Sequence, residues 1–154
     1  MKEKPRFFIL VGDEEAWKIG LKKTQWGFSD NSKGLWRTSK IGDYLAFYAT
    51  SPHSKIIGFG SITDKFIDDS LIWPDEKYLF KKSIWSYRIK FKVFHKIVNW
   101  DKGIKPPLMP MNTGRKVIDA KVFYSLVNTA DKNWKTKIHE KLSSSPKYQD
   151  DIKA

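Results

Sequence analysis

Two apolar segments separated by a short turn-forming stretch constrain the fold of this chain more than any other feature. Residues 44–49 (YLAFYA) are aromatic or aliphatic throughout, and residues 55–63 (KIIGFGSIT) are rich in β-branched side chains. Residues 50–54 (TSPHS) between them have turn chemistry, so a β-hairpin is predicted over residues 42–66. Both runs are nearly continuous in apolar character, which predicts strands covered on both faces at the centre of a sheet or barrel.

Gly58 and Gly60 interrupt the second strand of this hairpin. A missing side chain inside a strand marks a bulge, a bend, or the close approach of a ligand or another backbone. No helix is predicted directly after these glycines, so they do not form a dinucleotide-binding or P-loop motif.

The segments before the hairpin predict a strand, a helix and a loop. Residues 6–11 (RFFILV) are typical of a buried strand. A helix is predicted over residues 14–22 with Asp13 as its N-cap, because acidic residues begin it and lysines end it. The following segment, residues 24–37, is predicted to be a loop. Its Trp26 either closes the end of the core or contacts a ligand.

After the hairpin, a long irregular connection leads to a strand with two different faces. Pro74 breaks any helix within this connection. Residues 85–97 (WSYRIKFKVFHKI) alternate between apolar and basic side chains, which predicts a strand with one wet, basic face. That face carries Arg88, Lys90 and Lys92 at intervals of ~7 Å, a spacing suited to phosphate groups. A solvated face with no ligand explains these cations equally well.

The C-terminal part predicts helices and a tail. A helix capped by Asp119 is expected over residues 117–128, and a terminal helix over residues 132–142. Residues 143–154 have too few apolar side chains to offset the entropy of ordering, so a disordered tail is predicted. A chain of 154 residues suits a single domain, which we place at residues 1–142.

Charge is the first indication of function. The chain has 29 Lys and Arg against 17 Asp and Glu, a net charge of +12, and residues 131–154 contribute only +2 of it. This excess favours polyanions, and the seven tryptophans suit the binding of unpaired bases. A generally lysine-rich proteome is the alternative explanation of the charge.

Cysteine, membrane and catalytic signals are absent from the sequence. The lack of cysteine excludes disulfides and thiolate metal sites, and no apolar run reaches the ~18 residues of a membrane span, so a cytoplasmic protein is expected. His53, His95 and His139 show no zinc-site or catalytic-triad spacing, and Ser54 is not in a GxSxG elbow. We therefore expect no catalytic residue, no metal and no cofactor.

The order of segments adds a family resemblance. RFFILVG, a helix, QWGFSD, IGDYLAFYAT, KIIGFGSITDKF, a Trp-Pro segment, WSYRIKFKVF and PMNTGRKVI follow one another along the chain. This order resembles EVE domains, and more distantly YTH domains, both of the PUA-like superfamily, over about residues 6–127. The resemblance implies an α+β fold, a strongly curved β-barrel flanked by helices. It also implies a monomeric reader of DNA or RNA that takes a flipped, modified base into an aromatic pocket, with no membrane partner.

The resemblance further implies the residues of the pocket. Trp26 matches the tryptophan that forms one wall in YTH domains, and Trp73 matches the opposing wall. Tyr78 and Phe80 are two candidates for a third wall, which the sequence does not separate. Gly27 stands where YTH domains commonly have a small hydroxyl residue, which argues against N6-methyladenine as the specific ligand.

Polar roles follow from the same resemblance. Asp13 matches a polar group that reaches the base edge, a role that competes with helix capping. Arg115 matches a basic residue that contacts phosphate in YTH relatives, and would act with Arg88, Lys90 and Lys92.

Two other functions stay open on the sequence. ASCH domains, also PUA-like, include nucleic-acid hydrolases, and Lys40, Asp43 and Tyr44 are the residues that could assemble such a site here. A protein-interaction accessory domain with an incidental basic surface is the third hypothesis.

Overall fold

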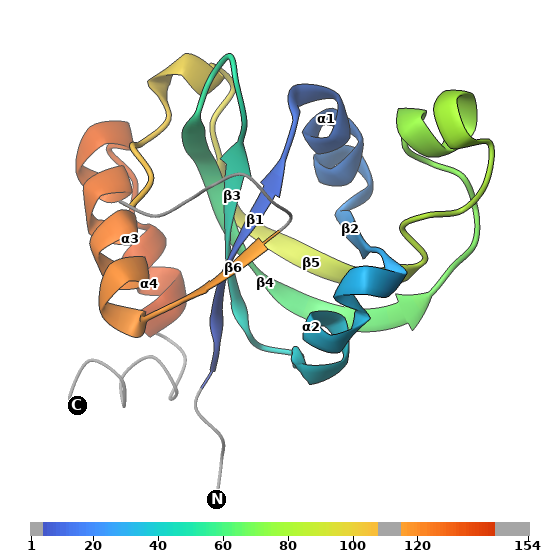
Figure 1. Cartoon of the computed structure of the whole chain (residues 1–154). Coiled ribbons are helices and arrows are strands. Elements are labelled where there is room, and N and C mark those ends of the chain that lie inside the picture. Colours follow the sequence, from blue (N-terminus) through green and yellow to red (C-terminus); the bar gives the residue numbers. More distant parts are fainter. Residues whose placement is uncertain (1–4, 108–114, 144–154) are drawn as a thin grey trace, which may run out of the picture.

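A six-stranded, strongly curved sheet forms the centre of the computed structural model, which describes residues 5–107 and 115–143 (Figure 1). The strand order is β2-β5-β4-β3-β1-β6; β1 and β3 are parallel and the other neighbours antiparallel. The strands are β1 (Phe7–Gly12), β2 (Gln25–Phe28), β3 (Tyr44–Ala49), β4 (Lys55–Ile67), β5 (Tyr87–Lys96) and β6 (Arg115–Ile118).

Helices cover both faces of this sheet, as predicted for a PUA-like α+β fold (Figure 1). The helices are α1 (Glu14–Lys23), α2 (Lys33–Thr38), α3 (Ala120–Trp134) and α4 (Ile138–Ser143), with the single turns η1 (Asp30–Ser32), η2 (Asp75–Phe80) and η3 (Trp100–Lys102). Among the described helices, none combines the length and apolar character that crossing a bilayer requires.

The predicted hairpin is confirmed as β3 and β4, and its glycines allow β5 to approach closely. A Cβ atom on Gly60 would lie 2.2 Å from the carbonyl oxygen of Lys92, and one on Gly58 would lie 2.7 Å from that of His95. Both distances are shorter than any Cβ contact allows. The prediction that these glycines mark a close backbone approach is therefore confirmed.

Alternating side chains of the central strands feed two cores. Phe7 and Ile9 of β1 pack with α3 and α4, whereas Phe8 and Leu10 pack with α1 on the other face. The nearly continuous apolar pattern of these strands has this cause, because each face of the sheet is covered. The second core, on the α1 face, continues into the candidate site.

The predicted loop over residues 24–37 contains two elements of regular structure. Residues 24–28 were expected to be loop, but β2 pairs with β5 there, with Trp26 opposite Ile89. Trp26 and Phe28 are buried on the same face, so β2 is a strand too short for its period to be recognised in the sequence. Residues 33–38 form α2, also in the expected loop.

The C-terminal boundaries also differ from those expected. The predicted helix start at residues 117–118 is wrong, because residues 115–118 form β6 along β1. Helix α3 then begins after Asp119 and continues to Trp134, where Lys135 has a left-handed φ of 57°. The predicted break at residues 129–131 is wrong because Ala130 is part of the buried helix face. Apart from Ser143 at the end of α4, the expected tail lies outside the described residues.

Candidate functional site

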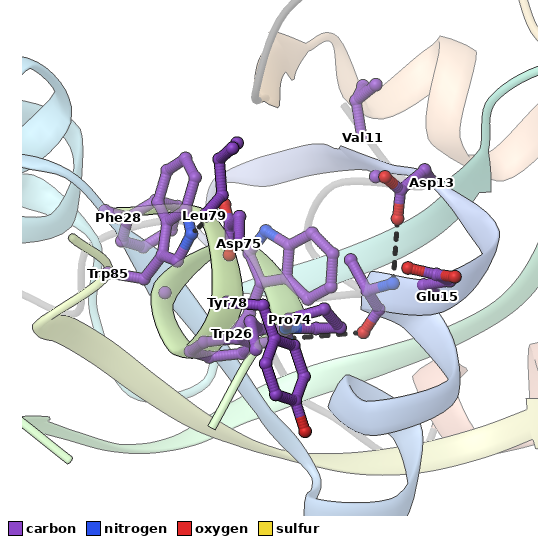
Figure 2. A pocket seen from close by; sticks show the side chains of 14 residues that line it. Val11, Asp13, Glu15, Trp26, Phe28, Pro74, Asp75, Tyr78, Leu79 and Trp85 are labelled. Atoms are coloured by element: carbon purple, nitrogen blue, oxygen red, sulfur yellow. Dashed lines mark hydrogen bonds between the residues drawn. The ribbon is translucent and has the colours of Figure 1, made fainter. Parts of the chain in front are cut away.

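A pocket of about 570 Å³ opens on the α1 face of the sheet, between α1, β2 and the loop that contains η2 (Figure 2). Figure 2 shows Asp13 and Glu15 on one side of it, with Phe28 and Trp85 on the other. It is lined by Val11, Gly12, Asp13, Glu15, Ala16, Trp26, Gly27, Phe28, Trp73, Pro74, Asp75, Tyr78, Leu79 and Trp85. Four of these residues are Trp or Tyr, so the lining offers several aromatic rings to a ligand.

Trp26 is a fixed platform at the base of this pocket. Its ring stacks on Trp17 with centroids 4.0 Å apart and an interplanar angle of 19°. Gly12 and Gly20 make room for it, because a Cβ atom on either would approach the Trp26 ring to 2.3 Å and 2.9 Å. The Trp17 Nε1–H donates to the Tyr48 carbonyl at 2.7 Å. Trp26 is 7% exposed, so it belongs to the core and lines the pocket at once.

Trp73 meets Trp26 at an angle and does not face it. The two ring centroids are 6.3 Å apart and the planes are inclined by 76°. Trp73 is 4% exposed and its Nε1–H donates to the Ala16 carbonyl at 3.3 Å, which ties the η2 loop to α1. The two indoles lie at a corner of the pocket, so the opposing arrangement implied by the resemblance is not the one observed.

The carboxylate of Glu76 holds the η2 loop together. This side chain is fully buried and accepts hydrogen bonds from four backbone N–H groups. Those of Ile84 and Trp85 lie at 2.8 and 3.0 Å, and those of Ile72 and Trp73 at 3.3 and 3.4 Å. Glu76 thus joins the start and end of the loop that carries the pocket aromatics. Sequence reasoning missed it, since nothing in Pro-Asp-Glu signals a buried acid.

Trp85 is a pocket residue that the sequence did not suggest. Its Nε1–H donates to Asp75 Oδ2 at 2.8 Å. A Cβ atom on Gly27 would lie 2.4 Å from the Trp85 Cβ and 2.8 Å from its carbonyl oxygen. The departure at Gly27 from the YTH pattern has this physical reason: Trp85 occupies the space that a side chain would need.

The structure separates the two candidates for a third wall. Tyr78 lines the pocket and is 76% exposed. Phe80 is 52% exposed and lies outside the lining. Of the two, only Tyr78 is placed to contact a ligand in the pocket.

The side chain of Asp13 is described by the structure, whereas for Arg115 only the backbone is. Asp13 caps α1, accepting the Ala16 N–H at 2.8 Å, and it also lines the pocket (Figure 2). The expected capping role is confirmed, and contact with a base edge stays a prediction. The backbone of Arg115 begins β6 opposite Leu10, but its side chain lies outside the described part of the chain.

The prediction that Arg88 lies on a wet face of β5 is wrong. Arg88 is 1% exposed and its guanidinium donates to the carbonyls of Trp85 and Ser70 and to the Ser70 hydroxyl. It also pairs with Asp68 at 3.4 Å and lies 5.2 Å from the ring centroid of Trp73. These contacts take the place of water around the guanidinium, and they support the η2 loop from inside. Arg88 is therefore not available to bind phosphate, the role that the sequence had predicted.

Lys90 and Lys92 are exposed, and neither lines the pocket. Lys92 lines a second hollow, between β5 and α4, together with Lys137 and Lys141. The phosphate contact expected for Lys90 and Lys92 stays a prediction.

The residues of the hydrolase hypothesis have structural roles. Asp43 is buried and accepts the backbone N–H groups of Arg6 and Lys40 at 3.0 and 2.8 Å. Tyr44 is buried in the core under α3. These positions leave no accessible cluster of Lys40, Asp43 and Tyr44. In the described ranges, no three His, Cys, Asp or Glu residues are placed to share a metal ion.

His53 makes an ion-pair clamp that its sequence spacing did not predict. Its Nε2 lies 2.8 Å from Glu14 Oε1 and its Nδ1 lies 2.7 Å from Asp101 Oδ1. Hydrogen bonds to Glu14 and then to Asp101 raise the pKa of His53 above the ordinary 6.5. The hydrogen bond from His53 likewise lowers the pKa of Glu14 below 4.5. The clamp ties the start of α1, next to Asp13, to the β3–β4 turn and η3.

This clamp predicts a pH dependence of stability. Because the folded state raises the His53 pKa, the stabilisation is complete below pH 6.5 and is lost as the pH rises through the raised value. Because the Glu14 pKa is lowered, its part is lost only as the pH falls below 4.5. The free energies of unfolding of the wild type and His53→Gln, measured in urea, should therefore differ most between pH 4.5 and pH 6.5 and converge at pH 9. A difference that grows with pH would contradict the clamp.

Comparison with known proteins finds solved structures of the same fold but no matching sequence family. No protein-family model matches the chain, and no curated protein matches it in sequence. Among solved structures, the Mmi1 YTH domain superposes with a TM-score of 0.60 at 15% identity, covering 88% of this chain and 94% of that chain. The Mmi1 protein has also been solved as a complex with RNA.

This chain has the YTH fold. The Pho92 YTH domain, solved in complex with m6A, superposes with a TM-score of 0.55 at 18% identity, covering 84% and 85% of the two chains. A protein from Pseudomonas syringae superposes with a TM-score of 0.51 at 17% identity, covering 80% and 98%. The expected PUA-like architecture is therefore confirmed, whereas at these identities the function has to be argued from the site.

Proposed function

We propose that this chain is a nucleic-acid-binding module that holds one flipped, modified base in the pocket between α1, β2 and the η2 loop. We assign it to the EVE type of PUA-like domain, as one monomeric domain over residues 1–142. The observation that carries the proposal is the meeting of Trp26, Trp73, Tyr78 and Trp85 in one pocket of about 570 Å³.

The aromatic lining suits a planar heterocycle. Stacking of a base on an aromatic side chain contributes about 1–3 kcal/mol, which offsets the few kcal/mol needed to unstack a base. Trp26 is held by Trp17 and by the glycines around it, so little side-chain entropy is lost on binding. The YTH domains with the same fold include complexes with RNA and with m6A, which supports a base as the ligand.

Three lysines of the η2 loop are proposed to contact the phosphate backbone of the nucleic acid. Lys77, Lys81 and Lys82 are exposed and lie on either side of Tyr78 in the sequence of the η2 loop. In Figure 1 this loop, in light green, lies beside α1 and away from α3 and α4. A strand whose base enters the pocket would bring its flanking phosphates to these lysines. Binding should therefore weaken steeply as salt is added.

Tyr78→Ala tests the proposal with little effect on the fold. Tyr78 is exposed and lines the pocket, so its loss should weaken binding of a modified single-stranded oligonucleotide about tenfold, by removing a stacking surface. The free energy of unfolding should change by no more than about 0.5 kcal/mol. The measurement is fluorescence anisotropy over a panel of methylated DNA and RNA oligonucleotides.

Phe80→Ala is the matched control, because Phe80 is an exposed aromatic of the same loop outside the pocket lining. Its affinity should equal that of the wild type. Equal effects of the two substitutions would mean that the loop surface binds the oligonucleotide and the pocket does not.

A further inference from the structure

The charge of the pocket lining is opposite to that of the chain. Asp13, Glu15 and Asp75 line the pocket, and none of its described lining residues is Lys, Arg or His. The chain as a whole carries +12. Positive charge on the surface attracts any nucleic acid. The three carboxylates that line the pocket oppose this attraction, so we expect them to act on the base in the pocket and not on the phosphates.

Two of these carboxylates are fixed by hydrogen bonds and keep acceptor capacity. Asp13 uses Oδ1 for the Ala16 N–H. Asp75 accepts the Glu76 N–H at Oδ1 and the Trp85 Nε1–H at Oδ2, both at 2.8 Å. An ionised carboxylate offers about four acceptor positions, so each can accept a further hydrogen bond from a ligand. A ligand that donates hydrogen bonds or carries positive charge is favoured at this wall.

The aromatic walls favour the same kind of ligand. The faces of Trp and Tyr rings attract cations, most strongly where water is excluded. The Arg88 guanidinium already lies 5.2 Å from the ring centroid of Trp73, so the rings left to contact a ligand cation are those of Tyr78 and Trp85. Tyr78 and Trp85 line the same pocket as the carboxylates, so one ligand can contact both kinds of group.

We infer that the pocket selects bases that carry a positive charge through methylation of a ring nitrogen, such as 1-methyladenine. This inference rests on the proposed function. A neutral modified base such as N6-methyladenine gains the stacking but little attraction from the carboxylates, whereas the cationic isomer gains both.

A methylated lysine side chain is a second kind of cation that an aromatic, acidic pocket accepts. Lys77, Lys81 and Lys82 are exposed on the η2 loop that carries Tyr78, and their charge favours a polyanion over the basic peptides that carry methyl-lysine. A nucleic acid is therefore the polymer that we assign to this site.

The test compares two isomeric bases in one RNA. Short single-stranded RNAs carrying 1-methyladenine, N6-methyladenine or adenine at the same position are titrated at pH 7 by anisotropy. We expect at least about tenfold tighter binding of the 1-methyladenine RNA, equal to about 1.4 kcal/mol. In the double variant Asp13→Asn, Glu15→Gln the preference should fall below about threefold, because the 1-methyladenine RNA loses more affinity than the N6-methyladenine RNA. Asparagine still caps α1, so the fold is kept.

Glu140→Gln on α4 removes one negative charge on the other side of the sheet and should leave the preference intact. Tyr78-dependent binding without preference for the cation would overturn this inference and leave the proposed function standing. Absence of Tyr78-dependent binding to any of the RNAs would overturn both. Tighter binding of a trimethyl-lysine peptide than of the 1-methyladenine RNA would overturn the assignment to nucleic acid.

Discussion

Trp26→Ala is expected to lower the free energy of unfolding by about 4 kcal/mol, the middle of the range for a buried aromatic side chain. The substitution removes the stack on Trp17 and leaves an empty space between Gly12 and Gly20, neither of which has a side chain to fill it. The Trp17 ring would lose its stacking partner, and the pocket would lose the ring that forms its floor. Chemical denaturation followed by far-UV circular dichroism measures the change.

Trp100→Ala is the control, because Trp100 is only half-buried and meets the His53 ring edge-on, with the ring centroids 5.5 Å apart. It should cost less than half as much as Trp26→Ala. A loss below about 1 kcal/mol for Trp26→Ala would contradict the stacked, buried position. Because Trp26 is part of the core, weaker ligand binding by Trp26→Ala would not show that Trp26 contacts the ligand. Tyr78→Ala tests ligand contact instead, since Tyr78 is exposed.

Glu76→Ala is expected to destabilise the protein by about 3 kcal/mol and to open the η2 loop. Four backbone N–H groups would lose their acceptor inside the protein, where an unsatisfied group costs about 1–3 kcal/mol before relaxation. Because the loop can then unfold locally, water would reach part of these groups and limit the total loss. Binding of any ligand to the pocket should fall in parallel.

Amide hydrogen exchange is the direct measurement for this variant. The amides of Ile72, Trp73, Ile84 and Trp85 should lose protection together, while those of β3 keep theirs. Glu15→Ala is the control, since Glu15 is exposed on α1 and should change stability by no more than about 0.5 kcal/mol. Protection that survives in Glu76→Ala would show that the loop is held by other contacts.

Both predictions concern residues whose roles the sequence did not reveal in full. Trp26 was recognised as either a core or a ligand-contacting residue, and the structure shows it in the core with part of its ring on the pocket. Glu76 was not recognised because its partners are backbone N–H groups, which carry no signal in residue type. Trp85 was not recognised because nothing in the sequence indicates that it packs against Gly27 and donates to Asp75. Arg88 was misplaced since period-2 alternation gives the face of a strand but not what covers that face.

The sequence alone determined the central hairpin, the buried first strand, the capped helix after it and the PUA-like architecture. The hairpin, the strand and the helix follow from local rules: strand runs of apolar residues, turn chemistry, and an N-cap with charges matched to the helix dipole. The PUA-like architecture was implied by the resemblance in the order of segments. Only the tertiary structure decided which aromatic residues share a pocket, and that its carboxylates come from α1 and the η2 loop. Those positions depend on contacts between segments about 60 residues apart, such as the Trp73 indole on the Ala16 carbonyl, for which no local pattern exists.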